Sequence, residues 1–347
     1  MRECCMVICP HLQSERSLYS QDPMPRPMKN LLYYLLLLTA FASETQSLCA
    51  VRGDEPLQIE RPFLWEIQPP DSQVVSWLFG TIHVNDPQIT RLHPQADAAF
   101  SAASAVWFEI DFVKDSVAQT KAISLEPGQH LTDFIDKETV ARIDARLKKL
   151  SPLLSRQALP EFRVVMWPVI LANLEAQMRQ LGQLPMDMKL QAAAREANKI
   201  SGGLEDPGTQ LKPLLDLTLV QQREFLIASL DVLDEDEKNN VRQIEALMRL
   251  YAKGEAETLY EYLQTELQRP QLSDELRNVF IDALLLARNE RMAVAINERI
   301  QADPDLAHFA AVGTAHLLGP GSVQESLEKL GYQIRRVEPE KTDTTEP

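Results

Sequence analysis

Short apolar runs separated by turn residues dominate residues 60–112. The segments FLWEI and VVSWLFG flank the turn QPPDSQ, a pattern that predicts two strands joined as a hairpin. The segment LHPQADAAFSAAS then carries apolar residues at helical spacing. AVWFEIDF alternates, with Val106 and Phe108 on one face and Glu109 on the other. The predicted order is therefore a hairpin, the tetrapeptide GTIH, a helix and a strand.

The same order recurs near the end of the chain. HFAAV predicts a strand, GTAH follows it, and Ser322 with Glu325 forms the Ser-x-x-Glu signature of a helix start. Gly331 is expected to end that helix, and YQIRRV predicts a last strand. The two similar units bracket the chain in the way that a distant internal repeat would.

Amphipathic helical patterns fill the segment between the two units. Breaks are predicted at Pro152, Pro185, Gly202-Gly203, Pro207, Gly254 and Pro270. The acidic run DVLDEDEKNN is interpreted as a solvated corner between helices. We therefore predict an α/β (α+β) fold in which two strand-GTxH-helix-strand halves form one central sheet, and a long all-helical insertion covers the cleft.

The predicted domain spans residues 60–338. Its N-terminal half is 60–112, its helical insertion 113–305 and its C-terminal half 306–338. Residues 339–347 are polar and are expected to be disordered.

The first 42 residues have the pattern of an export signal. Arg26 and Lys29 precede the apolar run LLYYLLLLTAFA, which ends in the small-x-small triplet Ala40-Phe41-Ala42. Residues 1–42 are therefore predicted to be an upstream leader with a cleaved signal peptide, and 43–59 a linker, so that no stable membrane span remains. We expect an exported, periplasmic protein. The alternative is a lipoprotein tethered through Cys49.

Composition narrows the chemistry that this chain can perform. Of its 347 residues, 45% are hydrophobic, which is sufficient for a sizeable core. A net charge of −15 argues against nucleic acid or an anionic membrane surface as a partner. The four cysteines all lie within the first 49 residues, which excludes a disulfide scaffold, a thiol nucleophile and a cysteine-ligated metal in the domain.

The repeated GTxH tetrapeptides are the strongest candidate for a site. Gly80 and Gly313 would form sharp turns at strand ends, from which His83 and His316 would point into one crevice. Glu109 lies on the strand that completes the first unit. Two imidazoles and a carboxylate suit a divalent metal such as zinc, manganese or cobalt. Without metal, the same residues could supply a histidine general base oriented by a carboxylate.

These segments, together with RNERMA and LEKLGYQIRRV, resemble the TraB/GumN family (TraB/PrgY/GumN) over residues 60–338. The resemblance implies a fold related to the Tiki metalloproteases, the erythromycin-esterase-like enzymes and the haem-binding ChaN-like proteins. In Tiki-like members the paired histidines and an early glutamate are held to form a metal-dependent peptidase site. Those positions correspond here to His83, His316 and Glu109, with Gly80 and Gly313 shaping the loops.

The resemblance also implies neighbours of that site. Asp187 and Glu205 would lie beside the cleft, although Pro185 and Asp206 depart from the family pattern. Arg288 and Asn289 match the family's Arg-Asn pair. Arg288 either forms a structural salt bridge, or binds a substrate carboxylate, or supports Glu109.

The leading hypothesis is an exported metal-dependent hydrolase that cleaves peptide bonds, with Glu205 or Arg288 helping to position the substrate. Two alternatives stay open: a non-catalytic protein that binds a peptide or haem, and a metal-free esterase with His83 as its base. The expected partner is a peptide or small-molecule substrate, and the oligomeric state is not predicted. The remaining histidines of the domain are expected to be structural: His93, His130 and His308.

Overall fold

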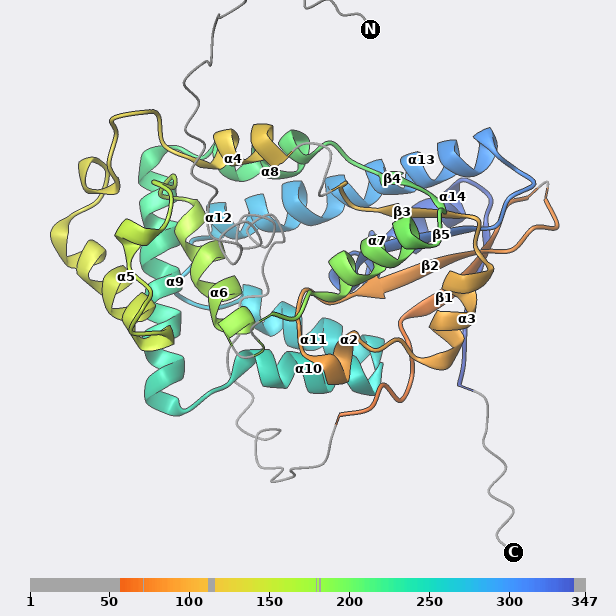
Figure 1. The fold of residues 1–347 in the computed structure, drawn as a ribbon, viewed down its shortest axis with the longest axis horizontal. Helices are drawn as coiled ribbons and strands as arrows, with labels where there is room; N and C mark the ends of the chain where they lie inside the picture. Colours follow the sequence, from red (N-terminus) through yellow and green to blue (C-terminus); the bar gives the residue numbers. More distant parts are fainter. Residues whose placement is uncertain (1–56, 71, 112–115, 179, 181, 340–347) are drawn as a thin grey trace, which may run out of the picture.

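The strands form one six-stranded sheet in the part of the chain that the computed structural model describes, residues 57–339 without 71, 112–115, 179 and 181 (Figure 1). Its order is β4-β3-β5-β2-β1-β6. The strands are β1 (Leu64–Gln68), β2 (Ser76–Thr81), β3 (Ala105–Phe108), β4 (Ile200–Gly203), β5 (His308–Gly313) and β6 (Gln333–Arg336).

Helices make up most of the remaining structure. Those before β4 are α2 (Pro87–Thr90), α3 (Pro94–Ala102), α4 (Ser116–Ile123), α5 (Lys137–Leu150), α6 (Met166–Met178) and α7 (Met186–Glu196). Those between β4 and β5 are α8 (Pro207–Leu215), α9 (Leu219–Asn239), α10 (Gln243–Lys253), α11 (Ala256–Leu267), α12 (Asp274–Asn278) and α13 (Ala287–Ala302). The last helix is α14 (Val323–Lys329).

The two predicted halves interleave in the sheet. β2 and β5, the strands that end within the GTxH tetrapeptides, are parallel neighbours in which Thr81 pairs with Gly313. β3 adds in parallel on the far side of β5, and β4 follows in parallel. β1 and β2 form the predicted antiparallel hairpin, and β6 pairs antiparallel with β1. As a result, β2, β5, β3 and β4 all end at the same edge of the sheet.

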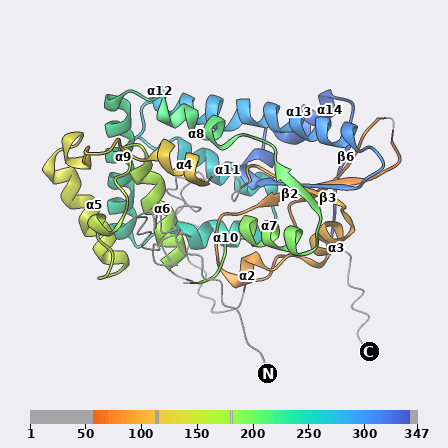
Figure 2. The ribbon, with the colours of Figure 1, turned by 45° about the horizontal axis from the view of Figure 1, so that its top comes forward.

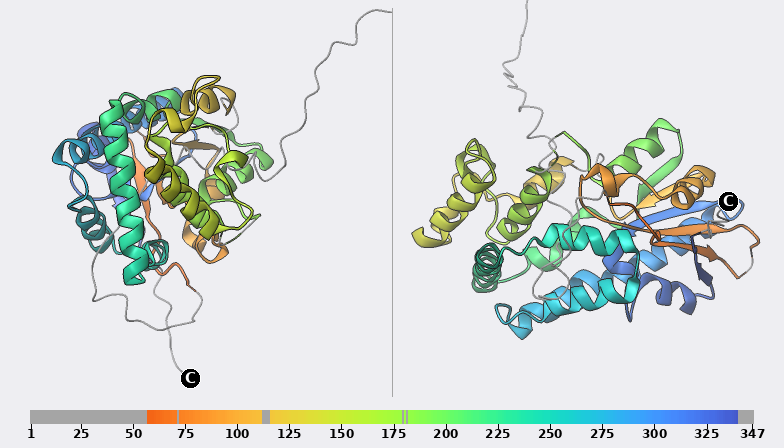
Figure 3. Two further views of the ribbon diagram at one scale, coloured as in Figure 1. Left: turned by 90° about the vertical axis from the view of Figure 1, so that its left-hand side faces the viewer. Right: turned by 90° about the horizontal axis from the view of Figure 1, so that it is seen from below.

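Helices cover both faces of this sheet. Figures 2 and 3 show α3 and α7 on one face and α13 and α14 on the other. The helices α5, α6 and α9 lie beyond the carboxyl ends of the parallel strands (Figure 1). Among the described residues, no helix is long and apolar enough to cross a membrane.

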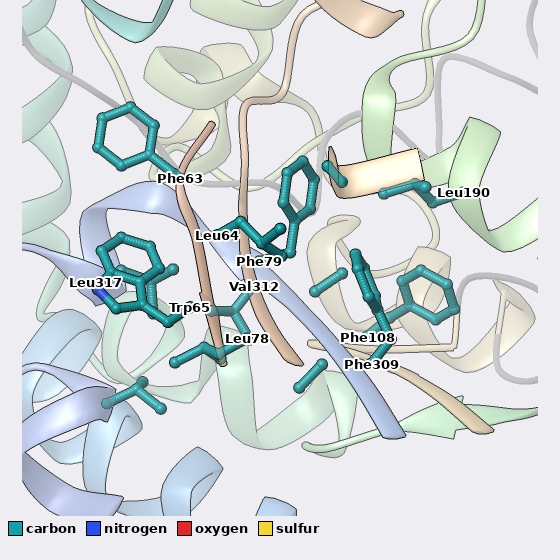
Figure 4. Packing of buried hydrophobic residues seen from close by; sticks show 14 of the residues in the cluster. Phe63, Leu64, Trp65, Leu78, Phe79, Phe108, Leu190, Phe309, Val312 and Leu317 are labelled. Atoms are coloured by element: carbon teal, nitrogen blue, oxygen red, sulfur yellow. The ribbon is translucent and has the colours of Figure 1, made fainter. Parts of the chain in front are cut away.

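Two clusters of buried hydrophobic residues stabilise the structure. One surrounds the sheet and includes Phe79 and Phe309, whose ring centroids are 5.5 Å apart (Figure 4). The other lies among the helices and includes Trp167 and Phe225, both fully buried. Burial of aromatic side chains contributes strongly because each removes a large apolar area from water.

The mixed α/β class, the hairpin and the single central sheet shared by both halves are confirmed, and the middle segment is mostly helical. Ser322 is the N-cap of α14, as predicted, and Gly331 follows that helix with φ of +91°. The Glu325 carboxylate accepts from the Gly321 amide instead of closing a capping box on Ser322. The predicted leader, Cys49 and most of the polar tail lie outside the described residues.

Two details of the helical middle were predicted wrongly. Gly202 and Gly203, interpreted as a helix break, belong to β4, so the middle is not all-helical. Glycine suits this strand because a Cβ at Gly202 would lie 3.3 Å from the Trp107 ring of the neighbouring strand.

The acidic run is not a corner either, because α9 continues through it to Asn239. Its Asp234 and Glu237 form ion pairs with Arg146 and Lys149 of α5. These ion pairs join the acidic segment of α9 to α5 through partly exposed side chains.

Candidate active site

The residues singled out in the sequence follow the four parallel strands where these end together. His83 lies two residues after β2, Glu109 directly after β3, Glu205 two residues after β4, and His316 three residues after β5. Open α/β sheets bind ligands at this carboxyl edge. Topology alone therefore brings the predicted residues, which are far apart in sequence, to one edge of the sheet.

A cavity of about 410 Å³ lies at this edge. Its volume is within the range of pockets that bind small ligands. Of the predicted site residues, His83, Glu109, Arg288, Gly313 and His316 line it. Gly80 does not line it, and the other three, Asp187, Glu205 and Asn289, lie behind lining residues with which they form hydrogen bonds.

The two tetrapeptide glycines permit close packing. A Cβ at Gly80 would lie 2.8 Å from Thr314 Oγ1 and 2.9 Å from the Phe63 Cβ, so a larger residue would separate the strands. A Cβ at Gly313 would lie 3.0 Å from Glu109 Oε1 and 3.4 Å from His83 Nε2. Gly313 therefore leaves free the point over which the predicted ligands converge.

His83 is held by a carboxylate from the first turn of α7. Its Nδ1 lies 2.6 Å from Asp187 Oδ2, and Thr81 Oγ1 donates to Asp187 Oδ1 over 2.5 Å. Because an ionised carboxylate only accepts, His83 carries its proton on Nδ1 and presents Nε2 to the cavity. Burial lowers the pKa of His83, but Asp187 and Glu109 raise it by more, so that the net shift is upward.

His316 is held differently, by an amide. Its Nδ1 lies 2.6 Å from Asn289 Oδ1, while Asn289 Nδ2 donates to the Gly321 carbonyl over 2.7 Å, which orients the amide. His316 Nδ1 is therefore also the protonated nitrogen. Burial, reinforced by the nearby Arg288, lowers the pKa of His316 to about 3. This imidazole stays neutral at physiological pH and offers Nε2 as a lone-pair donor.

Glu109 lies between the histidines with every oxygen hydrogen-bonded. Its Oε1 accepts from the Gly313 amide at 2.6 Å, and its Oε2 accepts from Arg288 at 2.5 Å and from Gln210 at 3.0 Å. Burial raises its pKa, but Arg288, both imidazoles and the Gly313 amide lower it by more. The pKa of Glu109 therefore lies far below its usual range, and the carboxylate is ionised.

Arg288 connects two of the strand ends. It donates to Glu109 and, over 2.7 Å, to Glu205 Oε2, and Arg291 pairs with the other Glu205 oxygen. The Glu205 side chain is 1% exposed and does not line the cavity. Glu205 therefore reaches the cavity only through Arg288, and its role in positioning substrate stays a prediction. Of the open alternatives for Arg288, the structure shows the salt bridge and the contact with Glu109.

Two residues of this network were missed from the sequence. Gln210 of α8 donates to Glu109, and the buried Tyr251 of α10 donates to the Gly80 carbonyl over 2.7 Å. Neither belongs to a recognisable motif, and each occupies an ordinary position in an amphipathic helix. Only their spatial neighbours reveal their role.

The other histidines of the domain lie elsewhere. His93 is the N-cap of α3, and the exposed His130 pairs with Glu161. The buried His308 accepts from the Trp107 indole over 3.0 Å, and its other nitrogen lies 3.0 Å from the Asp303 carbonyl. Each has a local partner, and none lines the cavity.

The donors at this site were predicted from the sequence to hold a divalent metal. Within the described ranges, no group of three or more His, Cys, Asp or Glu side chains is arranged to hold a metal ion. The chemistry of the donors nevertheless fits. Both imidazoles hydrogen-bond through Nδ1 and leave Nε2 free, as metal-ligating histidines do. His316 Nε2 lies 3.9 Å from Glu109 Oε1, which supplies the negative charge.

The fold and this site agree with a known family. The TraB/PrgY/gumN family model matches residues 63–336, and the chain belongs to that family. The match covers the sheet, the helical middle and both GTxH tetrapeptides, close to the range expected from the sequence.

Curated relatives carry the name of a class of enzyme. The chain is 26% identical to "Metalloprotease TIKI1" of Danio rerio over 82% of this chain and 64% of that protein. It is 24% identical to the Homo sapiens protein of the same name over 81% of this chain and 63% of that protein. A "Metalloprotease TIKI homolog" of Nematostella vectensis is 23% identical over 80% and 67%. The chain thus spans about two thirds of the length of these relatives. No solved structure gives a significant match.

Proposed function

We propose that this protein is a metal-dependent hydrolase that acts on peptide bonds. The observation that carries the proposal is the convergence over Gly313 of His83 Nε2, the His316 ring and the ionised Glu109. The names of the relatives in the TraB/PrgY/gumN family support the same chemistry. His83 and His316 would hold the metal, and Glu109 would be the third ligand. Imidazole and carboxylate together suit zinc, manganese or cobalt.

The metal, when bound, would supply an acidified water and polarise the substrate carbonyl. The chain's own residues would prepare the site for it. Asp187 and Asn289 keep each histidine in the Nδ1-protonated form, which leaves Nε2 available. Arg288 and Gln210 hold Glu109 in one orientation and keep it charged. This low basicity favours Glu109 as a ligand or fixed charge over Glu109 as a general base.

A second function, a metal-free esterase, is favoured by one specific feature. Asp187 and His83 form a carboxylate-histidine pair, which is the orientation that a histidine general base requires. In that case His83 would remove a proton from water at the cavity floor. Insensitivity of turnover to a chelator would distinguish this function from the first.

The proposal extends to location and substrate. A cleaved signal within residues 1–42 would export the domain to the periplasm, or Cys49 would tether it as a lipoprotein. Mass spectrometry of the mature protein would locate the new N-terminus, and a lipid adduct on Cys49 would support the tethered form. A peptide or small molecule is the proposed substrate, because the cavity has the size of a ligand pocket.

Elemental analysis of the purified chain, compared with a double variant His83→Ala, His316→Ala, tests the main proposal. We expect about one equivalent of transition metal in the native protein and none in the variant. The matched control is His93→Ala, His130→Ala, which also removes two imidazoles but leaves the cavity intact. Peptide hydrolysis should disappear with chelator and return with zinc, manganese or cobalt. Full metal content in the His83, His316 variant would contradict the proposed site.

A further inference from the structure

The cavity extends outward from the histidines between helices. One wall comes from α6 and the end of α9, and the other from α10 and α11. We name this outer part the aliphatic groove. It is lined by Leu171, Leu233, Ile244, Leu247, Leu259 and Leu263. Four of these side chains, all except Leu171 and Leu259, are only half-buried, so apolar area inside the cavity is left in contact with solvent.

The groove is continuous with the candidate active site. Ile244, Leu247 and Tyr251 are spaced i, i+3 and i+7 along α10, so they form one stripe on that helix. The inner end of the stripe is anchored at the sheet, because the Tyr251 hydroxyl donates to the carbonyl of Gly80. The stripe therefore runs from the end of β2 outward along the groove.

The opposite wall is tied to the loop that carries His83. Asn85, two residues after His83, donates its amide to the Gln180 carbonyl over 2.9 Å, just beyond the end of α6. The end of α6 is thus held near the loop after β2, and Leu171 faces the cavity from that helix. A peptide extending from the histidines would pass between this wall and α10.

Most charged side chains at the outer end of the groove are already paired. Arg146 pairs with Asp234 at 2.6 Å, and Lys149 with Glu237 at 2.6 Å. Asp236, which also lines the cavity, pairs with Arg269 at 3.0 Å. A charged ligand side chain would lose its hydration here without gaining one of these partners, whereas an aliphatic side chain would cover exposed apolar area.

We propose that the aliphatic groove is the specificity pocket of this site and takes an unbranched or branched aliphatic side chain, such as leucine, isoleucine or methionine. The side chain would belong to an extended peptide, near the bond that reaches His83 and His316. Only the position of cleavage rests on the proposed function. Binding of the aliphatic residue does not require metal.

The test measures binding without turnover. Fluorescein-labelled peptides of the form Gly-Ala-X-Ala-Gly, with leucine, serine, aspartate or lysine at X, are titrated with chelator-treated full-length protein, and fluorescence anisotropy reports Kd. We expect the leucine peptide to bind at least tenfold more tightly than the other three, since each methylene in a hydrophobic pocket is worth roughly tenfold or more.

Variants locate the preference. Leu247→Asn should abolish it, whereas the matched control Leu330→Asn, a 41% exposed leucine outside the cavity, should leave it unchanged. A second variant, Ala172→Phe, adds a ring to a half-buried cavity residue and should weaken binding of the leucine peptide. Circular dichroism shows whether each variant is folded. If Leu247→Asn does not fold, the Ala172→Phe variant alone tests whether the groove binds the leucine side chain.

The outcomes separate this inference from the proposed function. Equal or tighter binding of the charged peptides, or an unchanged preference in both groove variants, would overturn the aliphatic groove as a specificity pocket. Selective binding of the leucine peptide by a protein that neither holds metal nor hydrolyses peptides would leave the groove standing and refute the metal-dependent hydrolase.

Discussion

At the scale of residues, the histidines of the two similar tetrapeptides have different hydrogen-bond partners. His83 faces the carboxylate of Asp187, and His316 faces the amide of Asn289. Both partners place the proton on Nδ1, but only the carboxylate raises the pKa of its histidine. The two histidines therefore share one geometry but have pKa values shifted in opposite directions, which the similar GTIH and GTAH tetrapeptides do not reveal.

Asp187→Asn tests the support of His83. An amide can turn its NH2 group toward the imidazole, so the Nδ1-protonated form loses its preference, and we expect metal affinity to fall about 10- to 100-fold. Competition with a chromogenic chelator measures it. Asp86→Asn, which removes another local carboxylate from the loop after β2, should leave the affinity within about twofold.

Gly313→Ala tests the convergence point of the donors. The added methyl would lie 3.0 Å from Glu109 Oε1 and 3.4 Å from His83 Nε2, so we expect metal binding to be lost. The backbone of β5 at this residue does not have positive φ, and the stability should therefore fall by only about 1–3 kcal/mol. Calorimetric metal titration beside urea unfolding measures both effects. Native metal affinity in this variant would contradict the proposed geometry.

At the scale of elements, α13 and α11 each carry a buried charged side chain, Arg288 and Glu266, whose burial is not indicated by the sequence pattern of its helix. A π-helical segment, Val279–Leu286, directly precedes α13, in which Arg288 is the second residue, and changes the helical register there. π-helical turns are frequent at functional sites, and here the turn precedes the residue that joins Glu109 to Glu205.

Arg288→Leu should be strongly destabilising. It leaves two buried carboxylates without their shared cation, and breaking a buried pair from one side costs about 3–5 kcal/mol. Arg291→Leu is the matched control on the same helix, because it also removes a Glu205 partner but its side chain is 42% exposed. We expect the Arg291→Leu variant to lose about 1 kcal/mol or less of unfolding free energy. If urea unfolding showed the same loss of unfolding free energy for Arg288→Leu and Arg291→Leu, burial would not make the Arg288 ion pairs more important for stability than the exposed pair.

A second buried group, Glu266 of α11, makes stability depend on pH. Burial raises its pKa to about 8, although Arg269 offsets part of the shift, and neither of its oxygens accepts a hydrogen bond in the described part of the chain. A carboxyl whose pKa is raised by folding contributes fully to the stability of the folded state below its unfolded-state pKa of 4.5. That contribution is lost as the pH rises toward 8.

Glu266→Gln should remove this dependence. Between pH 5 and pH 8 the free energy of unfolding of the native protein should fall by on the order of 2 kcal/mol more than that of the variant, as measured by urea unfolding. Asp236, whose pKa burial raises to about 6, is present in both proteins, and its charge also raises the pKa of Glu266, so the difference between the two proteins reports this coupled pair. Glu261→Gln, on the exposed side of the same helix, should behave like the native chain. The opposite slope would show that Glu266 is charged and stabilised when folded.

At the scale of the whole molecule, the site joins segments from across the chain. β2, β3 and β5 contribute the donors, and α7 and α13 contribute the groups that orient them. A ligand that binds these groups together binds the folded state and not the unfolded chain, so it stabilises the entire fold by mass action.

Metal should therefore raise the melting temperature of the native protein. At a free concentration about 100 times Kd the gain is about 2.7 kcal/mol, which corresponds to roughly 5–10 °C for a domain of this size. Differential scanning fluorimetry with and without chelator measures it. The His83→Ala, His316→Ala variant should show no shift, and an equal shift there would indicate binding elsewhere.

Much of this organisation could be predicted from the sequence because it depends on local periodicity. Alternation identified the hairpin and β3, helical spacing identified the helical middle, and the repeated GTxH with Glu109 identified the edge where the parallel strands end. Asp187, Arg288 and Asn289 were indicated only by resemblance to the family, and the structure places them against the histidines and Glu109.

Tertiary structure alone decided the rest. β4 is a strand because β3 offers it an unpaired edge, which outweighs the weak local preference of its two glycines. Gln210 and Tyr251 became part of the site because α8 and α10 pack against the strand ends, and Glu205 became a buried partner of Arg288 because α13 crosses the loop after β4. Patterns along the chain determine most of the strands and helices, with β4 as an exception. Which side chains then meet depends on packing between residues far apart in the sequence, such as Glu109 and Arg288, and local sequence carries no record of it.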